Sequence, residues 1–326
     1  MGNRLAPGVM LLLVVLPASS RPAAQDAEAQ RALSYDRNAP LDVQETGAER
    51  RAGITIHDMS YASPKGGRVP AYLVVPTGAC PCAAAIWGHW YWENSEYRNR
   101  TEFLEEAVAL APAGLVSLLT DGPIARPGHT PAANPLSEQA MADLVQQIVD
   151  MRRGADVLLS RREVDPPRLG YVGHSYNAAV GGVLRGLDTR FKAFVLMAGA
   201  LSDEVDRKSE EYQRYRQRVG PDVFDAFVAK YAWLDPGRFL SRASSAEVLL
   251  QFATEETFLT PARAREYEAN VAGPKRFRLY EAPHALDADA RRDRIAFLTE
   301  KLRLRALDPA AIARIPDLPQ PPPTRR

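Results

Sequence analysis

The sequence has few cysteines, almost no net charge and no hydrophobic run long enough to cross a membrane. Its 41 basic side chains nearly balance 40 acidic ones, so the formal charge is +1 and no strong field attracts nucleic acid or an anionic membrane. The apolar run near the N-terminus, residues 9–16, is too short to span a bilayer. We therefore expect no nucleic-acid partner and no stable insertion into a membrane.

The only cysteines are Cys80 and Cys82, which lie in "GACPC". A zinc site would need a second pair of ligands at a fitting spacing, and the sequence has none, so we expect no metal. In an oxidising compartment the two cysteines could form a disulfide, although Pro81 and the very short loop would strain it. The alternative is two free thiols, and both interpretations remain open.

The first twenty residues, "MGNRLAPGVMLLLVVLPASS", have the layout of a signal peptide: one Arg, an apolar run and then small residues. We predict a signal peptide over residues 1–24, cleaved after Ser20 or Ala24, and export to the periplasm or the medium. The alternative is a buried N-terminal helix. A polar leader, 25–50, then precedes one large domain over residues 51–305.

Strands and helices alternate through this domain. Two strands flanking "SPKGG" form a hairpin, and the later apolar runs are short enough to be strands buried on both faces. The expected strands are 53–62, 68–76, 83–89, 114–123, 168–174, 191–199, 247–255 and 275–282. This order predicts a mainly parallel sheet with helices on both faces, led by an antiparallel hairpin.

Two segments depart from this alternation. Residues 203–238 are polar and helix-prone, and we interpret them as a small helical cap inserted over the edge of the sheet. The tail, residues 306–326, is rich in proline, and its stretch "IPDLPQPPPTRR", residues 315–326, is expected to be extended or disordered.

The stretch "YVGHSYNAAVGG", residues 171–182, matches the strand–nucleophile–helix turn of a serine hydrolase. Ser175 would stand at the carboxyl end of a strand, and Gly173 would allow close backbone approach. A second glycine is usual where Asn177 stands, so a side chain there must fit against a neighbouring strand. We expect Asn177→Gly to keep activity and Asn177→Leu to disturb the turn. The alternative is that Ser175 is only a structural serine.

A nucleophilic serine needs a base, and the base needs an acid that orients it. Of five histidines, His284 follows the last expected strand and comes after the serine, so we predict that it is the base. A capping or surface histidine is the alternative. The acid should follow the preceding strand, where Glu255 and Glu256 both qualify.

With these motifs, residues 50–304 resemble the α/β-hydrolase superfamily, near its dienelactone hydrolase, acetyl xylan esterase and prolyl oligopeptidase-like branch. The family typically has a glycine, then the acid three positions later, then an apolar residue three further on. Ala253, Glu256 and Leu259 occupy these positions, so the resemblance favours Glu256 as the acid. The order Ser175, Glu256, His284 is the order expected of this fold.

The resemblance also implies an oxyanion hole after the third strand, in "IWGHWYW". Its donors would be the backbone N–H groups of Tyr176 and of Tyr91 or Trp90, although Trp90 stands where the family has glycine. His89, Trp90 and Trp92 would line the substrate pocket, unless this aromatic cluster is simply core packing.

These features together predict an exported serine hydrolase that cleaves small-molecule carboxylic esters through an acyl-enzyme, with no cofactor. One alternative keeps the fold and cleaves amide or peptide bonds, as an aminopeptidase does. Another is an inactive hydrolase fold that binds a ligand or partner. The sequence does not specify an oligomeric state.

Overall fold

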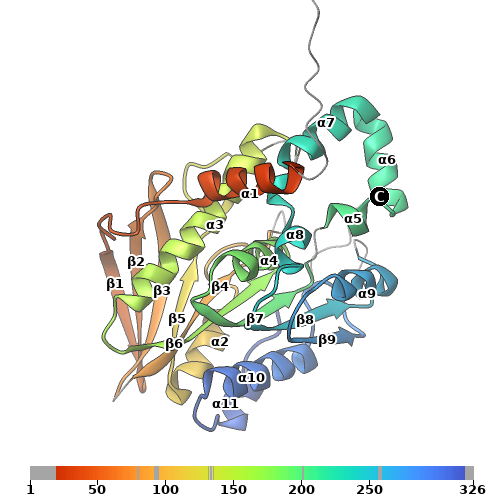
Figure 1. Cartoon of the computed structure of the whole chain (residues 1–326). Coiled ribbons are helices and arrows are strands. Elements are labelled where there is room, and N and C mark those ends of the chain that lie inside the picture. The colour runs from red at the N-terminus through yellow and green to blue at the C-terminus, as the bar shows by residue number, and fades with distance from the viewer. Residues whose placement is uncertain are drawn as a thin grey trace, which may run out of the picture.

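The computed structural model describes residues 20–78, 81–91, 95–130, 132, 134, 136–199, 202–255 and 259–319. These residues form one nine-stranded sheet with helices on both faces (Figure 1). The strands are β1 (Gln44–Arg51), β2 (Ile54–Ala62), β3 (Arg68–Pro76), β4 (Cys82–Gly88), β5 (Leu115–Thr120), β6 (Val164–His174), β7 (Phe191–Met197), β8 (Glu247–Ala253) and β9 (Lys275–Tyr280).

The strand order across the sheet is β1-β2-β3-β5-β4-β6-β7-β8-β9. The first strands pair antiparallel, and β5, β4, β6, β7, β8 and β9 run parallel to one another. Strands β4 and β5 are buried along their whole length, which explains their continuous apolar sequences. This architecture confirms the predicted fold class.

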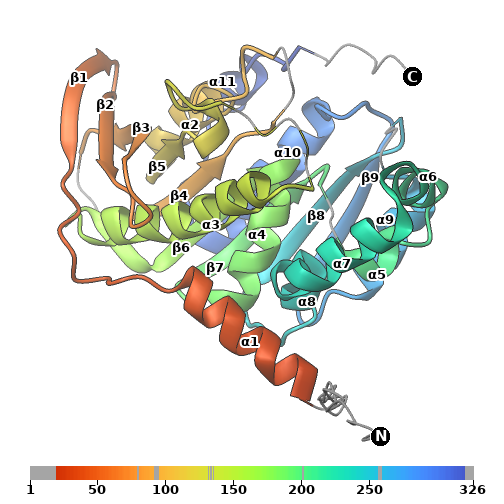
Figure 2. The ribbon, with the colours of Figure 1, turned by 90° about the horizontal axis from the view of Figure 1, so that it is seen from above.

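The helices divide between two faces. In chain order they are α1 (Ser20–Leu33), α2 (Leu104–Leu110), α3 (Glu138–Leu159), α4 (Tyr176–Leu187), α5 (Asp203–Asp206), α6 (Glu210–Val219), α7 (Pro221–Tyr231), α8 (Pro236–Leu240), α9 (Pro261–Ala269), α10 (Ala288–Leu302) and α11 (Pro309–Ala313), with short 3-10 helices η1 (Ala111–Ala113), η2 (Pro123–Ala125) and η3 (Ala232–Leu234). Helices α1, α3, α4, α8 and α9 bury apolar residues on one face, and α2 and α10 do so on the other, where Ile312 of α11 is partly buried (Figures 1 and 2).

Helices α5 to α8 form the insertion between β7 and β8, and α6 and α7 project away from the sheet (Figure 1). Lys230 on α7 pairs with Glu138 at the start of α3 over 2.6 Å. Asp206 on α5 pairs with Arg263 on α9. Ion pairs therefore connect the insertion to the main body through α7 and through α5.

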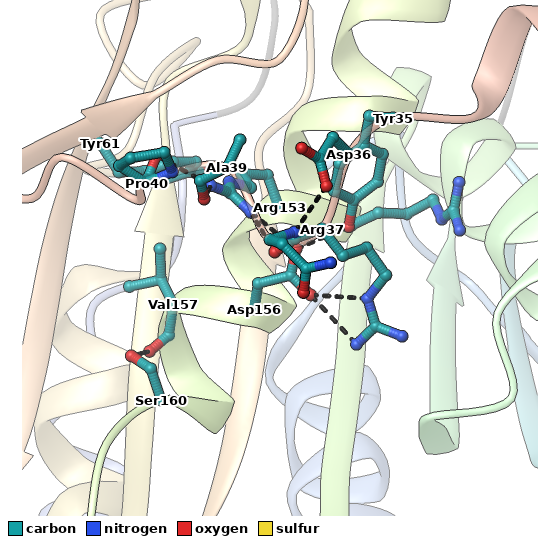
Figure 3. A network of polar contacts seen from close by, with 12 residues as sticks. Tyr35, Asp36, Arg37, Ala39, Pro40, Tyr61, Arg153, Asp156, Val157 and Ser160 are labelled. Carbon is teal, nitrogen blue, oxygen red and sulfur yellow. Dashed lines mark hydrogen bonds and ion pairs between the residues drawn. The ribbon is translucent and has the colours of Figure 1, made fainter.

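Part of the predicted leader is ordered against the main body. Helix α1 buries Ala29 and Leu33 in the core. The chain after it lies over α3, where the buried guanidinium of Arg153 donates to backbone carbonyls of the segment, among them that of Pro40 at 2.9 Å (Figure 3). Burial, together with a 2.8 Å hydrogen bond to Asp156, raises the pKa of Tyr35 to about 12.

Besides helix α1, two elements were not predicted from the sequence. Strand β1 is exposed along almost its whole length, so it has no apolar alternation that would indicate a strand. Helix α11 lies in the Pro-rich tail, before residues 315–326, the part that we expected to be extended or disordered. Ile315, just after α11, is buried with the core residues of α2 and α10, because the tail folds back to cover them.

Parallel strands bring their carboxyl ends to one edge of the sheet. Gly88 of β4 stands opposite Gly173 of β6, and Ala253 of β8 stands opposite Tyr280 of β9. The residues that follow these four positions therefore meet at this edge, which is where ligand sites form in open α/β sheets.

At the opposite end of β4, Cys82 is disulfide-bonded, and Cys80 lies outside the described residues. Within the part of the chain that the structure describes, no helix is both long and apolar enough to cross a membrane.

Candidate active site

Ser175 occupies a sharp turn between β6 and α4. Its backbone angles are φ 52° and ψ −110°, a conformation that residues with a side chain rarely adopt. Its N–H donates to the carbonyl of Met197 at the end of β7 over 2.7 Å, which fixes the turn to the neighbouring strand. Such strain costs about 1–3 kcal/mol and persists where the surroundings enforce it, typically at functional sites.

Glycines let the chain approach itself closely around this turn. A Cβ added to Gly173 would come within 2.2 Å of the carbonyl oxygen of Asn177. A Cβ on Gly199, after β7, would come within 2.2 Å of the carbonyl oxygen of Ser175. Both contacts are shorter than real carbon–oxygen contacts, so the turn could not form in this way with larger residues at 173 or 199.

Asn177 is fully buried, and its side chain packs against β4, the neighbouring strand. A Cβ on Gly88 would lie 2.6 Å from the Cβ of Asn177, so the glycine on β4 makes room for the asparagine on α4. The Asn177 amide donates to the carbonyl of His89 over 2.6 Å, and its oxygen accepts from the Gln147 side chain over 2.8 Å. We did not predict these two hydrogen bonds from the sequence, and Gln147 was not recognised as a partner of Asn177.

These contacts change the expectation for Asn177→Gly. Glycine would leave the buried His89 carbonyl and the Gln147 amide without their partner, at about 1–3 kcal/mol for each unsatisfied group. We now expect the free energy of unfolding to fall by roughly 2–4 kcal/mol, measured by urea denaturation, and kcat to fall with it. Asn270→Gly, the same change at the exposed end of α9, is the control. Equal losses in the two variants would contradict a special role for Asn177.

His284 lies in the loop between β9 and α10 and is buried. Its backbone carbonyl is 3.0 Å from Nε2 of His174, the residue directly before Ser175. The rings of these two histidines are stacked, with their centroids 5.3 Å apart. The structure therefore brings the loop of the predicted base against the turn of the predicted nucleophile.

His89 and Trp90 follow β4. His89 Nε2 accepts the N–H of Gly122 over 2.9 Å, so Nδ1 carries the ring hydrogen and donates it to the Trp90 carbonyl over 2.6 Å. Burial lowers the pKa of His89, which keeps it neutral. The His89 ring is thus occupied by backbone groups, and Trp90 is only 1% exposed. Trp92 lies outside the described residues.

The backbone N–H groups of Tyr91, Tyr176 and Trp90 are the predicted donors to the oxyanion, and that of Trp90 already has an acceptor. The Trp90 N–H donates to the carboxylate of Glu102 over 2.6 Å and is therefore already engaged. Tyr91, the next residue, is partly exposed. Tyr176 is the first residue of α4, so the helix provides no acceptor for its N–H. Burial and the nearby Asp143 raise the pKa of the Tyr176 phenol, so that group is neutral.

Glu102 is a residue that the sequence did not single out. It precedes α2, its side chain is fully buried, and its Oε1 is 2.5 Å from Nδ1 of His174. Its other oxygen accepts the Trp90 N–H. The partner histidine is 72 positions away in the chain, so no local pattern indicates the contact.

The predicted acid, Glu256, lies outside the described residues. The alternative, Glu255, is exposed, and its N–H donates to the carbonyl of Ala282 over 3.2 Å. The remaining histidines pair elsewhere: His57 Nδ1 lies 2.9 Å from Glu45 and His129 Nε2 lies 3.1 Å from Asp143. Across the described ranges, no group of three or more His, Cys, Asp or Glu side chains is placed to hold a metal ion.

Comparison with known proteins identifies the fold. No family model matches the chain. No curated protein matches its sequence. Among solved structures, an acetyl xylan esterase from Paenibacillus sp. R4 superimposes with a TM-score of 0.69 at 18% identity, covering 88% of this chain and 100% of that one. The acetyl xylan esterase 1 of Thermoanaerobacterium sp. JW/SL YS485 gives 0.67 at 17% identity, covering 87% and 98%.

Two further solved structures have a similar fold. A glucuronoyl esterase from Solibacter usitatus gives a TM-score of 0.59 at 15% identity, covering 88% of this chain and 94% of that one. A prolyl endopeptidase gives 0.57 at 16% identity, but this chain spans only 40% of its length. The chain therefore has the α/β-hydrolase fold. Its structural neighbours are acetyl xylan esterases, other esterases and a prolyl endopeptidase, which agrees with the resemblance found in the sequence.

Proposed function

We propose that this protein is a serine hydrolase that cleaves carboxylic esters of small molecules, with Ser175 as the nucleophile. The observation that carries the proposal is the backbone of Ser175, a non-glycine residue with φ 52° at a strand-to-helix turn of this fold. Such a turn lifts the serine hydroxyl clear of the sheet. The loop of His284 packed against the preceding residue adds support.

In the proposed mechanism, His284 accepts the hydroxyl proton as Ser175 Oγ attacks the ester carbonyl. The backbone N–H groups of Tyr91 and Tyr176 stabilise the negative oxygen of the tetrahedral intermediate. His284 returns the proton to the departing alcohol, which leaves an acyl-enzyme on Ser175. A water molecule then attacks this ester as His284 takes its proton. The bond between the acyl carbon and Ser175 Oγ breaks, His284 returns the proton to Oγ, and the carboxylic acid is released. These steps use only side chains, backbone and water.

We assign the orienting acid to Glu256. An acid in this role is shielded from water, because it must hold one tautomer of the histidine and stabilise its charged form. The exposure of Glu255 argues against that neighbour, and the family spacing from Ala253 to Leu259 favours Glu256.

A fluorophosphonate probe followed by mapping of the modified residue tests the proposal. We expect one modified site, at Ser175. An unmodified protein would instead favour the inactive, ligand-binding alternative. Matched substrates, p-nitrophenyl acetate and the corresponding anilide, separate ester from amide hydrolysis. Acetyl esters come first because two of the structural neighbours are named acetyl xylan esterases.

We also propose export, with the mature N-terminus between residues 21 and 26. Cleavage in this range would keep Ala29 and Leu33, the residues of α1 that are buried in the core. Protein recovered from the native cell should therefore be found outside the cytoplasm. N-terminal sequencing of that protein is the measurement, and an intact Met1 would rule the proposal out.

A further inference from the structure

We propose that the buried Glu102–His174 pair is a positioning device that holds the nucleophile turn, the oxyanion loop and the base loop in register. This inference rests on the function proposed above, because it concerns the spacing of the same catalytic groups. It adds two positioning residues, neither of which touches the substrate in the proposed mechanism.

Each contact of the pair reaches a different loop at the carboxyl edge of the sheet. Glu102 Oε2 accepts the N–H of Trp90, whose next residue supplies the proposed oxyanion donor. Glu102 Oε1 binds Nδ1 of His174, which immediately precedes Ser175. His174 Nε2 binds the backbone carbonyl of His284 itself. Two side chains thus connect the three loops that carry the proposed chemistry.

The hydrogen-bond partners define where the protons lie. His174 Nε2 faces a carbonyl, which only accepts, so this nitrogen must carry a hydrogen. His174 Nδ1 faces a carboxylate oxygen at 2.5 Å, and a lone pair there would be repelled, so a second proton lies between them. The pair is therefore neutral as a whole, and each of its polar contacts is directional.

The rings around the pair form a packed cluster. Trp90 stacks on His174 with centroids 5.1 Å apart, and on His284 at 6.1 Å with the ring planes only 9° from parallel. Because interiors are close-packed, a shift of Glu102 would move Trp90 and His174 and, through them, the ring of His284. The pair differs from an orienting acid, since both Glu102 oxygens are already bound to groups other than the base.

A buried acid–histidine pair could also serve stability alone, and two substitutions of Glu102 separate the two roles. Glu102→Asp keeps the charge but retracts the carboxylate by about one C–C bond, ~1.5 Å, so it cannot reach Trp90 and His174 together. Glu102→Gln removes the charge but keeps the reach. Its oxygen can still accept from Trp90, and its amide can donate to His174 Nδ1 while Nε2 keeps its hydrogen.

The matched control is Glu106→Asp. Glu106 lies one helical turn further along, is also buried, and binds Arg294 on α10 through three contacts of 2.6–3.1 Å. Shortening it disturbs a buried ion pair of the same segment without touching the three loops. We expect Glu106→Asp to lower the unfolding midpoint in urea. We expect its kcat to stay within about threefold of that of the unaltered protein, a change much smaller than the loss caused by a misplaced catalytic group.

The experiment measures kcat and KM for p-nitrophenyl acetate, the rate of fluorophosphonate labelling at Ser175, and the urea midpoint. Misplacement of catalytic groups by 1 Å costs on the order of a hundredfold. We expect Glu102→Asp to lower kcat and the labelling rate by about ten- to a hundredfold, with KM changed far less. Glu102→Gln should stay within about threefold of the unaltered protein.

Three results would overturn the inference: an unchanged kcat in Glu102→Asp, an equal loss in Glu102→Gln, or an equal loss in Glu106→Asp. Failure of the proposed function gives a different result, because the unaltered protein would then show no labelling at Ser175. Normal labelling of both the unaltered protein and Glu102→Asp would reject the positioning role alone.

Discussion

Ser175→Ala is expected to abolish hydrolysis of p-nitrophenyl acetate, lowering kcat by roughly five to six orders of magnitude. The substitution removes the one oxygen that attacks the ester, so no acyl-enzyme can form. The residual rate would come from binding and the oxyanion hole alone, which leave about 10³–10⁴-fold catalysis over water. Steady-state kinetics and loss of fluorophosphonate labelling measure the effect.

The fold should survive this change. The backbone hydrogen bond from residue 175 to Met197 does not involve the side chain, and alanine keeps the Cβ. A urea midpoint close to that of the unaltered protein is therefore expected. Ser160→Ala, at the C-terminal cap of α3, makes the same chemical change away from the site and should leave kcat unaltered. Substantial turnover by a folded Ser175→Ala protein would sink the nucleophile assignment.

Glu256→Gln is expected to lower kcat by about three to four orders of magnitude. Glutamine has nearly the same shape but no charge, so it neither stabilises the protonated His284 nor holds its correct tautomer. The adjacent Glu255→Gln is the matched control, and we expect only a mild effect because Glu255 is exposed. Measurement of kcat for both variants decides between them, and the reverse pattern would move the acid by one residue.

The order of elements from β2 to α10 could be predicted because each element has a clear local pattern. Strands β4 and β5 are continuous apolar runs, and α3 has apolar residues at helical spacing. Strand β1 could not be predicted in this way, since its residues are held by pairing with β2 and bury almost nothing. The folding of the tail onto α2 and α10 likewise depends on a surface that only the assembled fold creates.

The site follows the same division. That the loops of Ser175 and His284 lie together could be predicted, because each follows a recognisable strand and parallel strands end at one edge. Glu102 and Gln147 could not, since their contacts with His174 and Asn177 join segments distant in the chain. Hydrogen bonds between such segments leave no periodic signal in the sequence, however much they stabilise the structure.

The exchange of volume between Gly88 and Asn177 makes these two positions epistatic. The contribution of the side chain at 177 to the free energy of unfolding depends on the residue at 88, because a Cβ at 88 and the asparagine would compete for the same space. A larger residue at position 88 that is tolerated beside glycine at 177 would be harmful beside Asn177. Likewise, asparagine at 177 would be harmful in a chain with a larger residue at position 88. A sequence motif that requires the second glycine of the turn treats each position independently. It therefore does not match a chain in which the glycine that makes room lies on β4 and not on α4.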